Sequence, residues 1–394
     1  MSEGRGAPPP IRRQAYGVLF KEQAAFKDVY GGEEGYVFLE CMRITPRDRD
    51  SDTVIVFCHP TGRGAYLPIC SGLAHGGFHV AFIGTRYAGS DHALVMEKCA
   101  IDLGAGIADL KKRFGYKKVI LGGWSGGGSL SLFYQEQAQR PTVTHTPSGD
   151  PLDLSAAEMP AADAVMLLAA HVSRAVTLTE WIDASILDEA DPSKRDPALD
   201  LYAPEAPHQP PYSERFIADY RDAQIARNRR ITAWAQAQLQ RRRAQDGAAG
   251  EFAFVVHGTM ADPRWLDPAV DPSDRTPRVC YLGDPKTVNM GPVGLARFCT
   301  LRSWLSQWSY DLSNANGLKN GPHVDVPTLV VNNTADTACT PSHAQRLFDA
   351  IGHADKTLHH INGATHYYMN QPEQLRACVR LCGGWLAERD LVAG

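Results

Sequence analysis

Apolar runs alternate with stretches of helical periodicity along most of the chain. The runs 53–58 (TVIVFC) and 117–123 (KKVILGG) are rich in β-branched or apolar residues, which is typical of buried strands. Stretches such as 94–114 separate these runs and have the spacing of helices. This alternation predicts a mostly parallel sheet with helices on both faces. We expect further strands at 36–44, 79–83, 163–170, 326–333 and 356–361, and further helices at 126–139, 341–351 and 371–388.

The alternation stops between residues 172 and 322. Prolines are frequent over 190–211, which predicts a loop, whereas 212–243 lacks proline and glycine and predicts a long helix. We expect this interrupting segment to form a large, mainly helical cap with a small core of its own. A short strand at 252–256 and a helix at 294–312 are also expected there. The predicted division is a flexible N-terminal arm (1–14), a core in two parts (15–171 and 323–394) and the cap (172–322).

Composition and charge narrow the class of protein. The chain has 394 residues and a formal net charge of −4, which argues against a nucleic-acid partner. No apolar run approaches the roughly 20 residues of a membrane span. The nine cysteines have no spacing typical of a zinc site or a disulfide scaffold, so we expect no metal and a cytoplasmic location. Basic clusters at 227–230 and 241–243 are interpreted as a solvated helix face.

Candidate chemistry is concentrated at residues 123–127, which read Gly-Trp-Ser-Gly-Gly. This is the pattern G-x-S-x-G, and it lies between a predicted strand and a predicted helix. The turn is so sharp that the residues two before and two after the serine need to be glycine. It lifts Ser125 Oγ clear of the sheet at a helix N-terminus, where developing negative charge is favoured. Ser125 is therefore the candidate nucleophile.

A serine hydroxyl is a weak nucleophile unless a base activates it. His366 follows the last predicted strand, and Asp336 follows the strand before it. Both residues are therefore expected at the edge of the sheet where Ser125 lies. The chain order Ser125, Asp336, His366 is one of the known orders of a nucleophile–acid–base triad. We assign Asp336 as the acid and His366 as the base.

Acyl transfer also needs hydrogen-bond donors for the oxyanion. The backbone N–H of Gly126 is one candidate, because this residue follows the nucleophile. The loop after strand 53–58 is expected to supply the second donor, and Thr61 N–H is our candidate because Pro60 has no N–H. Arg63 in the same loop is a candidate for binding a substrate carboxylate, although pairing with an acidic neighbour or exposure to solvent is the more common role.

These motifs together resemble the α/β-hydrolase superfamily over residues 16–171 and 323–394. The segment 86–90 (RYAGS) is similar to a loop common in that superfamily, where it is structural. The resemblance implies an eight-stranded, mostly parallel sheet with helices on both faces. It also implies a cap between the sixth and seventh strands, and acyl transfer to water through an acyl-serine. The chain departs from the pattern at Pro60, where glycine is usual, and in the length of its cap.

We expect a hydrolase that cleaves a carboxylic ester of a small to medium, partly hydrophobic or aromatic substrate, without a cofactor. Trp124 beside the nucleophile and Tyr367 after the base are candidate substrate-binding residues. The same triad also suits a lactone, an amide, a thioester or the C–C bond of a diketone-like substrate, although Trp124 disfavours the last. A non-catalytic ligand-binding protein is the second alternative. The long cap helix is a candidate surface for a homodimer.

Overall fold

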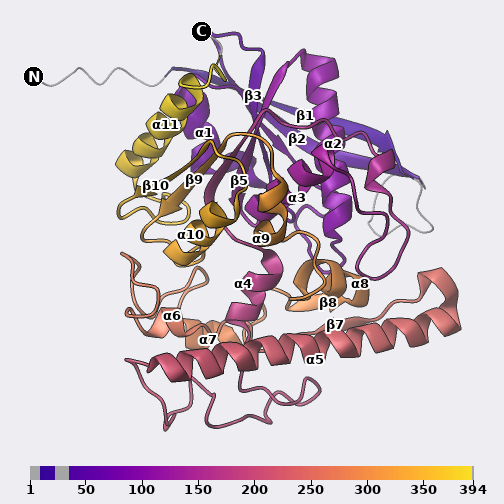
Figure 1. Cartoon of the computed structure of the whole chain (residues 1–394), viewed down its shortest axis with the longest axis vertical. Helices are drawn as coiled ribbons and strands as arrows, with labels where there is room; N and C mark the ends of the chain where they lie inside the picture. Colours follow the sequence, from indigo (N-terminus) through magenta and orange to yellow (C-terminus); the bar gives the residue numbers. More distant parts are fainter. Residues whose placement is uncertain (1–8, 23–34, 393–394) are drawn as a thin grey trace, which may run out of the picture.

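The computed structural model describes residues 9–22 and 35–392 (Figure 1). Its centre is an eight-stranded sheet with the strand order β1-β2-β4-β3-β5-β6-β9-β10. β2 pairs antiparallel with β1 and with β4, and every other pair is parallel, which confirms the mostly parallel sheet. The strands are β1 (Ile11–Lys21), β2 (Tyr36–Pro46), β3 (Thr53–Cys58), β4 (Val80–Ile83), β5 (Lys118–Ser125), β6 (Ala164–Ala170), β9 (Thr328–Asn333) and β10 (Lys356–Ile361).

Helices cover both faces of this sheet. α1 (Pro68–His75) and α11 (Pro372–Ala387) pack on one face. The other face carries α2 (Met96–Phe114), α3 (Gly127–Gln139) and α10 (Pro341–Ala350). Successive residues of a strand point to opposite faces, so each central strand serves both layers. Each predicted strand and helix of the core is present, and the strands β1 to β6 are followed by an insertion before the seventh strand, β9.

Alternate residues of β3 show how the two cores are built. Val54 and Val56 pack with the helices of one face, whereas Ile55 and Phe57 pack with α1 and α11 on the other. All four side chains are buried, with at most 1% of their surface exposed. Burial of an aliphatic or aromatic side chain of this size contributes about 1.5–3 kcal/mol. The sheet is therefore held by apolar contacts on both faces.

The chain between β6 and β9, residues 171–327, is called the inserted segment below. It lies beyond one edge of the sheet, with α4 running from the sheet towards the long helix α5 (Figure 1). β7 and β8 form a separate antiparallel pair. Its elements are α4 (Arg174–Trp181), α5 (Glu214–Asp246), β7 (Ala253–Val255), α6 (Pro263–Leu266), α7 (Pro285–Asn289), β8 (Phe298–Thr300), α8 (Leu301–Ser303), a π-helical turn (Trp304–Trp308) and α9 (Gly317–Asn320).

Helix α5 is the expected long helix of the inserted segment. Ser213 caps its N-terminus by accepting a hydrogen bond from Phe216 N at 3.2 Å. One stripe of the helix, including Ile231 and Leu239, packs on the apolar cluster around Trp304. The opposite face is exposed, so α5 is an amphipathic helix whose apolar face is this narrow stripe.

Two expectations from the sequence are wrong. Residues 294–312 are not one helix, because Ala296 has a positive φ of 56° and Phe298–Thr300 pairs as a strand with β7. The predicted arm 1–14 is not wholly free of structure either, since Ile11 to Gln14 belong to β1 and pair with Arg43 to Pro46 of β2. Residues 1–8 lie outside the described part of the chain.

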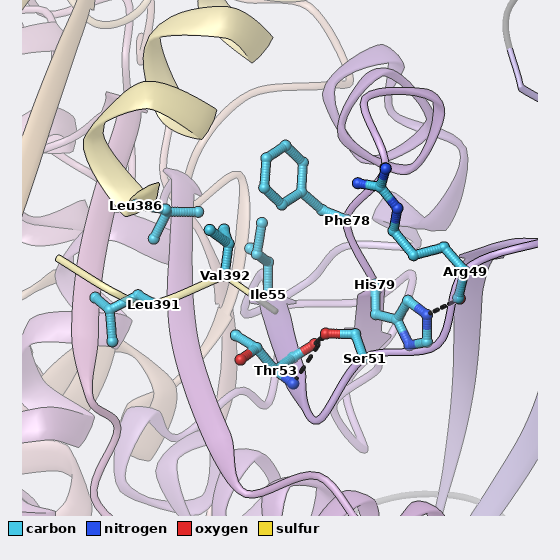
Figure 2. Close-up of a pocket in the computed structure, with 10 residues that line it drawn as sticks. Arg49, Ser51, Thr53, Ile55, Phe78, His79, Leu386, Leu391 and Val392 are labelled. Carbon is cyan, nitrogen blue, oxygen red and sulfur yellow. Dashed lines mark hydrogen bonds between the residues drawn. The ribbon is translucent and has the colours of Figure 1, made fainter. Parts of the chain in front are cut away.

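A small cavity of about 30 Å³ lies at the amino end of β3 (Figure 2). It is lined by Ile55, Phe78 and the C-terminal residues Leu386 and Leu391, and His79 Nε2 contacts Arg49 O at 2.9 Å on its rim. Ser125 stands at the carboxyl end of β5, whereas this cavity lies at the amino ends of the strands. The cavity is therefore separate from the candidate catalytic residues. The described helices include none that is long and apolar enough to cross a membrane.

Candidate active site

The strand β5 ends at Ser125 in a strained turn that leads directly into α3. Ser125 has φ of 53°, a conformation that non-glycine residues rarely adopt, and only 7% of its surface is exposed. A Cβ on Gly123 would stand 2.8 Å from the α-carbon of Gly128, and one on Gly127 would stand 2.3 Å from the carbonyl oxygen of Cys58. Glycine is thus required on both sides of the serine by close backbone contact.

The structure brings His366 and Asp336 together at the same edge. His366 Nδ1 lies 2.6 Å from Asp336 Oδ2, and both side chains are buried. The other carboxylate oxygen accepts hydrogen bonds from the N–H groups of Ala338 at 2.7 Å and Cys339 at 2.9 Å. A carboxylate can only accept, so His366 Nδ1 donates the shared hydrogen bond, and Nε2 is the ring nitrogen left to face other groups.

Trp124 links this pair to the nucleophile turn. Its Nε1 donates to the carbonyl oxygen of His366 at 3.2 Å, and its ring lies 4.6 Å from the His366 ring, centroid to centroid. Tyr367 packs beside both rings, with 39% of its own surface exposed. Among the described residues Ser125 Oγ has no hydrogen-bond partner, so the link between the serine turn and His366 is made by Trp124, the residue before the serine. Hydrogen bonds between a nucleophile and its base are often long in unliganded sites.

The loop after β3 is arranged differently from expectation. Thr61 N–H donates to His59 Nδ1 at 3.3 Å, and Thr61 Oγ1 lies 3.4 Å from the same nitrogen. Because a backbone N–H can only donate, His59 Nδ1 is an acceptor and the ring proton sits on Nε2. Burial, together with the charges of Arg174 and His366, lowers the pKa of His59 to about 3, so the ring is neutral. Arg63 is exposed at the outer end of this loop.

Three further side chains at this edge were missed from the sequence. His171 follows β6 and contacts Cys339 Sγ at 3.4 Å and Thr177 Oγ1 at 3.1 Å. Arg174 opens α4 with 6% of its side chain exposed. The ring of Tyr281, from the inserted segment, lies 5.4 Å from that of Trp181. His171 and Arg174 follow the end of β6 by one and four residues, and a place just after a strand is also what selected Asp336 and His366.

One set of side chains here has the composition of a metal site. The ligand atoms of Asp336, Cys339 and His366 lie within 4.8 Å of one another. Burial and the nearby Asp336 carboxylate raise the pKa of Cys339 well above its usual value, so its thiol stays protonated and is a poor ligand. The 2.6 Å hydrogen bond between the other two side chains already satisfies them. This arrangement fits proton transfer better than metal binding.

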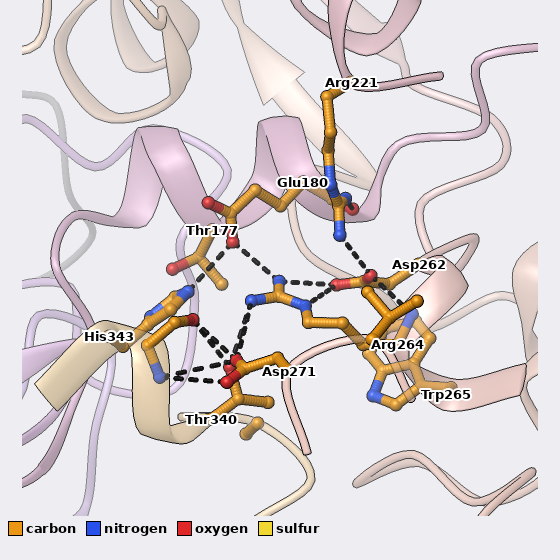
Figure 3. A network of polar contacts seen from close by, with 12 residues as sticks. Thr177, Glu180, Arg221, Asp262, Arg264, Trp265, Asp271, Thr340 and His343 are labelled. Atoms are coloured by element: carbon orange, nitrogen blue, oxygen red, sulfur yellow. Dashed lines mark hydrogen bonds and ion pairs between the residues drawn. The ribbon is translucent and has the colours of Figure 1, made fainter. Parts of the chain in front are cut away.

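A buried ionic network joins the inserted segment to the core beside the candidate site (Figure 3). Glu180 on α4 accepts from Arg264 Nη2 at 2.6 Å and contacts His343 Nε2 of α10 at 2.9 Å. Arg264 Nε also donates to Asp262 at 2.8 Å, and its Nη1 donates to Thr340 Oγ1 at 3.0 Å. Since Thr340 directly precedes α10, the network fixes the inserted segment against the loop that carries Asp336.

Fold and site together define an α/β-hydrolase-type protein: the antiparallel β2 is followed by a parallel sheet, and a strained serine turn precedes an aspartate–histidine pair. A sequence model of the family Hydrolase_4, serine aminopeptidase S33, matches residues 310–373. The chain therefore has the α/β-hydrolase fold, and the family model matches only the part of it that contains β9, Asp336 and His366.

Solved structures offer more distant similarities. The chain is similar to a monoacylglycerol lipase from Paleococcus ferrophilus, with 15% identity and a TM-score of 0.44 over 95% of this chain and 99% of that one. It is also similar to an esterase domain from Rhodothermus marinus, with 14% identity and a TM-score of 0.46 over 95% and 98%. At this distance the similarities carry no argument about activity. A comparison with curated protein sequences gives no match.

Proposed function

We propose that the chain is a serine hydrolase that cleaves carboxylic esters through an acyl-serine. The observation that carries the proposal is the 2.6 Å contact between His366 Nδ1 and Asp336 Oδ2 beside the strained Ser125 turn. Ser125 Oγ attacks the carbonyl carbon while His366 Nε2 accepts the hydroxyl proton, and Asp336 stabilises the charged ring. His366 then returns the proton to the leaving alkoxide. Water deacylates the serine with the same histidine as base.

The oxyanion is held first by the N–H of Gly126, at the N-terminus of the 13-residue helix α3. A donor of this kind is worth about 3–4 kcal/mol in the transition state. Thr61 N–H serves as the second donor only if it exchanges its 3.3 Å bond to His59 Nδ1 for the substrate oxygen. The proposed mechanism requires no cofactor or metal.

The aromatic surroundings support a small to medium, partly hydrophobic or aromatic ester. The rings of Trp124 and Tyr367 lie beside the base, tilted to one another with centroids 5.2 Å apart, and Tyr281 reaches the same region from the inserted segment. Aromatic rings of this kind bury apolar substrate surface and orient it. We propose that the inserted segment acts as the cap that selects the substrate.

The location and assembly of the protein are proposed on separate grounds. All nine cysteines are free and buried, which supports a reducing cytoplasmic location. A homodimer through α5 stays a prediction, and light scattering of the purified chain tests it.

The decisive experiment is labelling with a fluorophosphonate followed by a panel of esters, lactones, amides and thioesters. We expect the label on Ser125, and Ser125→Ala should lower kcat on esters by about 10⁴-fold or more. Ser131→Ala is the matched control, because this buried serine lies in α3, six residues beyond the nucleophile. It should keep both labelling and turnover.

The panel separates the alternatives. Labelling of Ser125 with turnover of a lactone, amide, thioester or C–C substrate but of no simple ester would overturn the ester assignment and keep the triad. Absence of labelling in a folded protein would overturn the triad itself and favour a ligand-binding role.

A further inference from the structure

Arg174 lies beside the nucleophile turn without belonging to the proposed triad. It is the first residue of α4 and stands four positions after Ala170, the last residue of β6, which neighbours β5 in the sheet. Its Nη1 lies 3.2 Å from the position that a Cβ on Gly126 would occupy. Gly126 is the residue after Ser125, so the guanidinium faces the place where a substrate must approach the serine.

The rest of the Arg174 side chain is firmly held. Nε donates to Gln307 Oε1 at 2.7 Å, Nη2 donates to Asp91 Oδ2 at 3.1 Å, and the guanidinium carbon lies 4.4 Å above the Trp308 ring. Among the described residues Nη1 has no hydrogen-bond partner. The guanidinium is thus fixed on three sides and presents one N–H edge to the site.

The charge of Arg174 is only partly compensated. Its one carboxylate partner within residues 9–22 and 35–392 is Asp91, which is 35% exposed, whereas the Arg174 side chain is 6% exposed. Burial lowers the pKa of the guanidinium, although Asp91 opposes this effect. The other carboxylate near the serine, Asp336, is bonded to His366. An anion placed at Nη1 would therefore be stabilised by a desolvated cation.

A second donor converges on the same point. His59 Nε2 lies 3.0 Å from the position of a Cβ on Gly126. The bond from Thr61 N–H to Nδ1 leaves the ring proton on Nε2, and this N–H has no partner among the described residues. Glycine at position 126 leaves this space open, because any side chain would meet both His59 and Arg174. Two convergent donors match the two oxygens of a carboxylate.

Resting on the proposed esterase activity, we propose that Arg174 Nη1 and His59 Nε2 form a carboxylate-binding subsite beside Gly126. The substrate is then an ester that carries a free carboxylate, such as the half-ester of a dicarboxylic acid. If the two donors instead held the oxyanion of the scissile carbonyl, they would act equally on charged and neutral esters, because every ester forms that oxyanion.

The test compares monomethyl with dimethyl esters of succinate, glutarate and adipate, followed by pH-stat titration. Each pair shares its acyl chain and differs by one negative charge. The wild type should have a higher kcat/KM for the monomethyl ester of at least one chain length. Arg174→Gln should lower that value by about 30-fold or more, with less than a threefold change for the dimethyl ester. Arg174→Lys, which keeps the charge, should recover part of the loss. Arg229→Gln, an exposed arginine of α5 paired with Asp311, is the charge-matched control and should change neither value.

Other outcomes overturn the proposal. A wild type that prefers every dimethyl ester, or an Arg174→Gln variant that loses both esters equally, would show that Arg174 acts on the scissile group or on the fold. Calorimetric titration with the dicarboxylate of the preferred chain length tests the subsite without turnover. Ser125→Ala should bind it, and Arg174→Gln should bind it at least about 10-fold more weakly. Binding without ester turnover or fluorophosphonate labelling would therefore overturn the esterase and keep the subsite, whereas turnover without binding would do the reverse.

Discussion

The interior of the central sheet and the interior of the inserted segment are built from different side chains. All six residues of β3 are buried, and five of them are apolar or cysteine. The inserted segment instead buries charged groups among its tryptophans. Its buried arginines are Arg174, Arg227, Arg264, Arg275, Arg297 and Arg302. Apolar burial is non-directional, whereas each buried guanidinium needs partners at fixed positions. The sheet should therefore tolerate the exchange of one apolar side chain for another of similar size. The stability of the inserted segment depends instead on specific pairs of charged groups.

The difference predicts the largest stability effect at Arg264. Arg264→Met removes the cation between Glu180 and Asp262 and leaves two buried carboxylates without it. Breaking a buried pair in this way costs about 3–5 kcal/mol. Urea unfolding at pH 7 measures the loss. Leu121→Ala in β5, a fully buried aliphatic residue, is the matched core variant and should cost about 2–5 kcal/mol.

The pH dependence distinguishes these two losses. Burial alone would raise the pKa of Glu180, but Arg264 and His343 hold it well below its usual value. A carboxyl with a lowered folded pKa contributes stability above its unfolded pKa, and this contribution is lost as the pH falls through the folded value. The deficit of Arg264→Met should therefore shrink below about pH 4.5, while that of Leu121→Ala stays constant. Equal pH dependence would contradict the comparison.

A second prediction tests the turn at which the two regions meet. Gly127→Ala would place a Cβ 2.3 Å from the carbonyl oxygen of Cys58, which is backbone and cannot move cheaply. We expect a loss of about 1–3 kcal/mol in unfolding free energy. Because the strain displaces Ser125, fluorophosphonate labelling should slow even under conditions where the variant is fully folded. Labelling at the wild-type rate would show that the turn tolerates a side chain.

The same contrast explains what the sequence could predict. Strands such as β3 and β5 are visible as apolar runs, and residues that follow strands, such as Asp336 and His366, can be placed at one edge by topology alone. The basic cluster 227–230 was interpreted as a solvated face, yet Arg227 is 1% exposed. Its partners are Glu189 and the carbonyl oxygens of Asp183, His257 and Gly258. No pattern of neighbouring residues in the sequence predicts these pairs, because the partners lie far from Arg227 along the chain.

The candidate site also has one part that the sequence predicts and another part that it does not. The nucleophile turn has a local signature, because close backbone contacts demand glycine at fixed positions. The tautomer of His59 depends on a single hydrogen bond from Thr61 N–H, and the position of Arg174 depends on Gln307 in a distant part of the chain. These features follow from tertiary contacts. The expected helix at 294–312 is wrong for a related reason, because Phe298–Thr300 pairs with β7, which lies 43 to 47 residues earlier in the chain.

A smaller effect is expected where the core helix α2 meets the inserted segment. Glu97 accepts hydrogen bonds from Ser306 Oγ at 2.7 Å and Asn314 Nδ2 at 2.9 Å. Burial raises its pKa, and these hydrogen bonds offset the effect only in part. A carboxyl with a raised folded pKa contributes stability at low pH that is lost as the pH rises through the folded value.

Glu97→Gln should remove the loss of stability that the ionisation of Glu97 causes at high pH, because glutamine does not ionise. The glutamine amide can accept from Ser306 and donate to a reoriented Asn314 amide, so both partners stay bonded. We expect a gain of the order of 1 kcal/mol at pH 8 and no gain near pH 4, measured by urea unfolding at both values. A variant that is less stable than the wild type at pH 8 would show that the ionised carboxylate is fully compensated by its two donors.

The smallest effect is expected at a glycine that no contact requires. Gly384 lies on the exposed face of α11, and a Cβ placed there would meet nothing within 4 Å. Replacing an internal helix glycine by alanine restricts the unfolded chain and favours the helix by about 0.5–1 kcal/mol. Gly384→Ala should therefore stabilise the protein by that amount in urea unfolding, with unchanged labelling of Ser125. Gly383→Ala next to it is the matched control, because its Cβ would stand 2.9 Å from the Phe78 ring and should give less or no gain. Equal gains at both positions would mean that helix propensity alone decides, and that packing of α11 on the sheet is loose enough to absorb a methyl group.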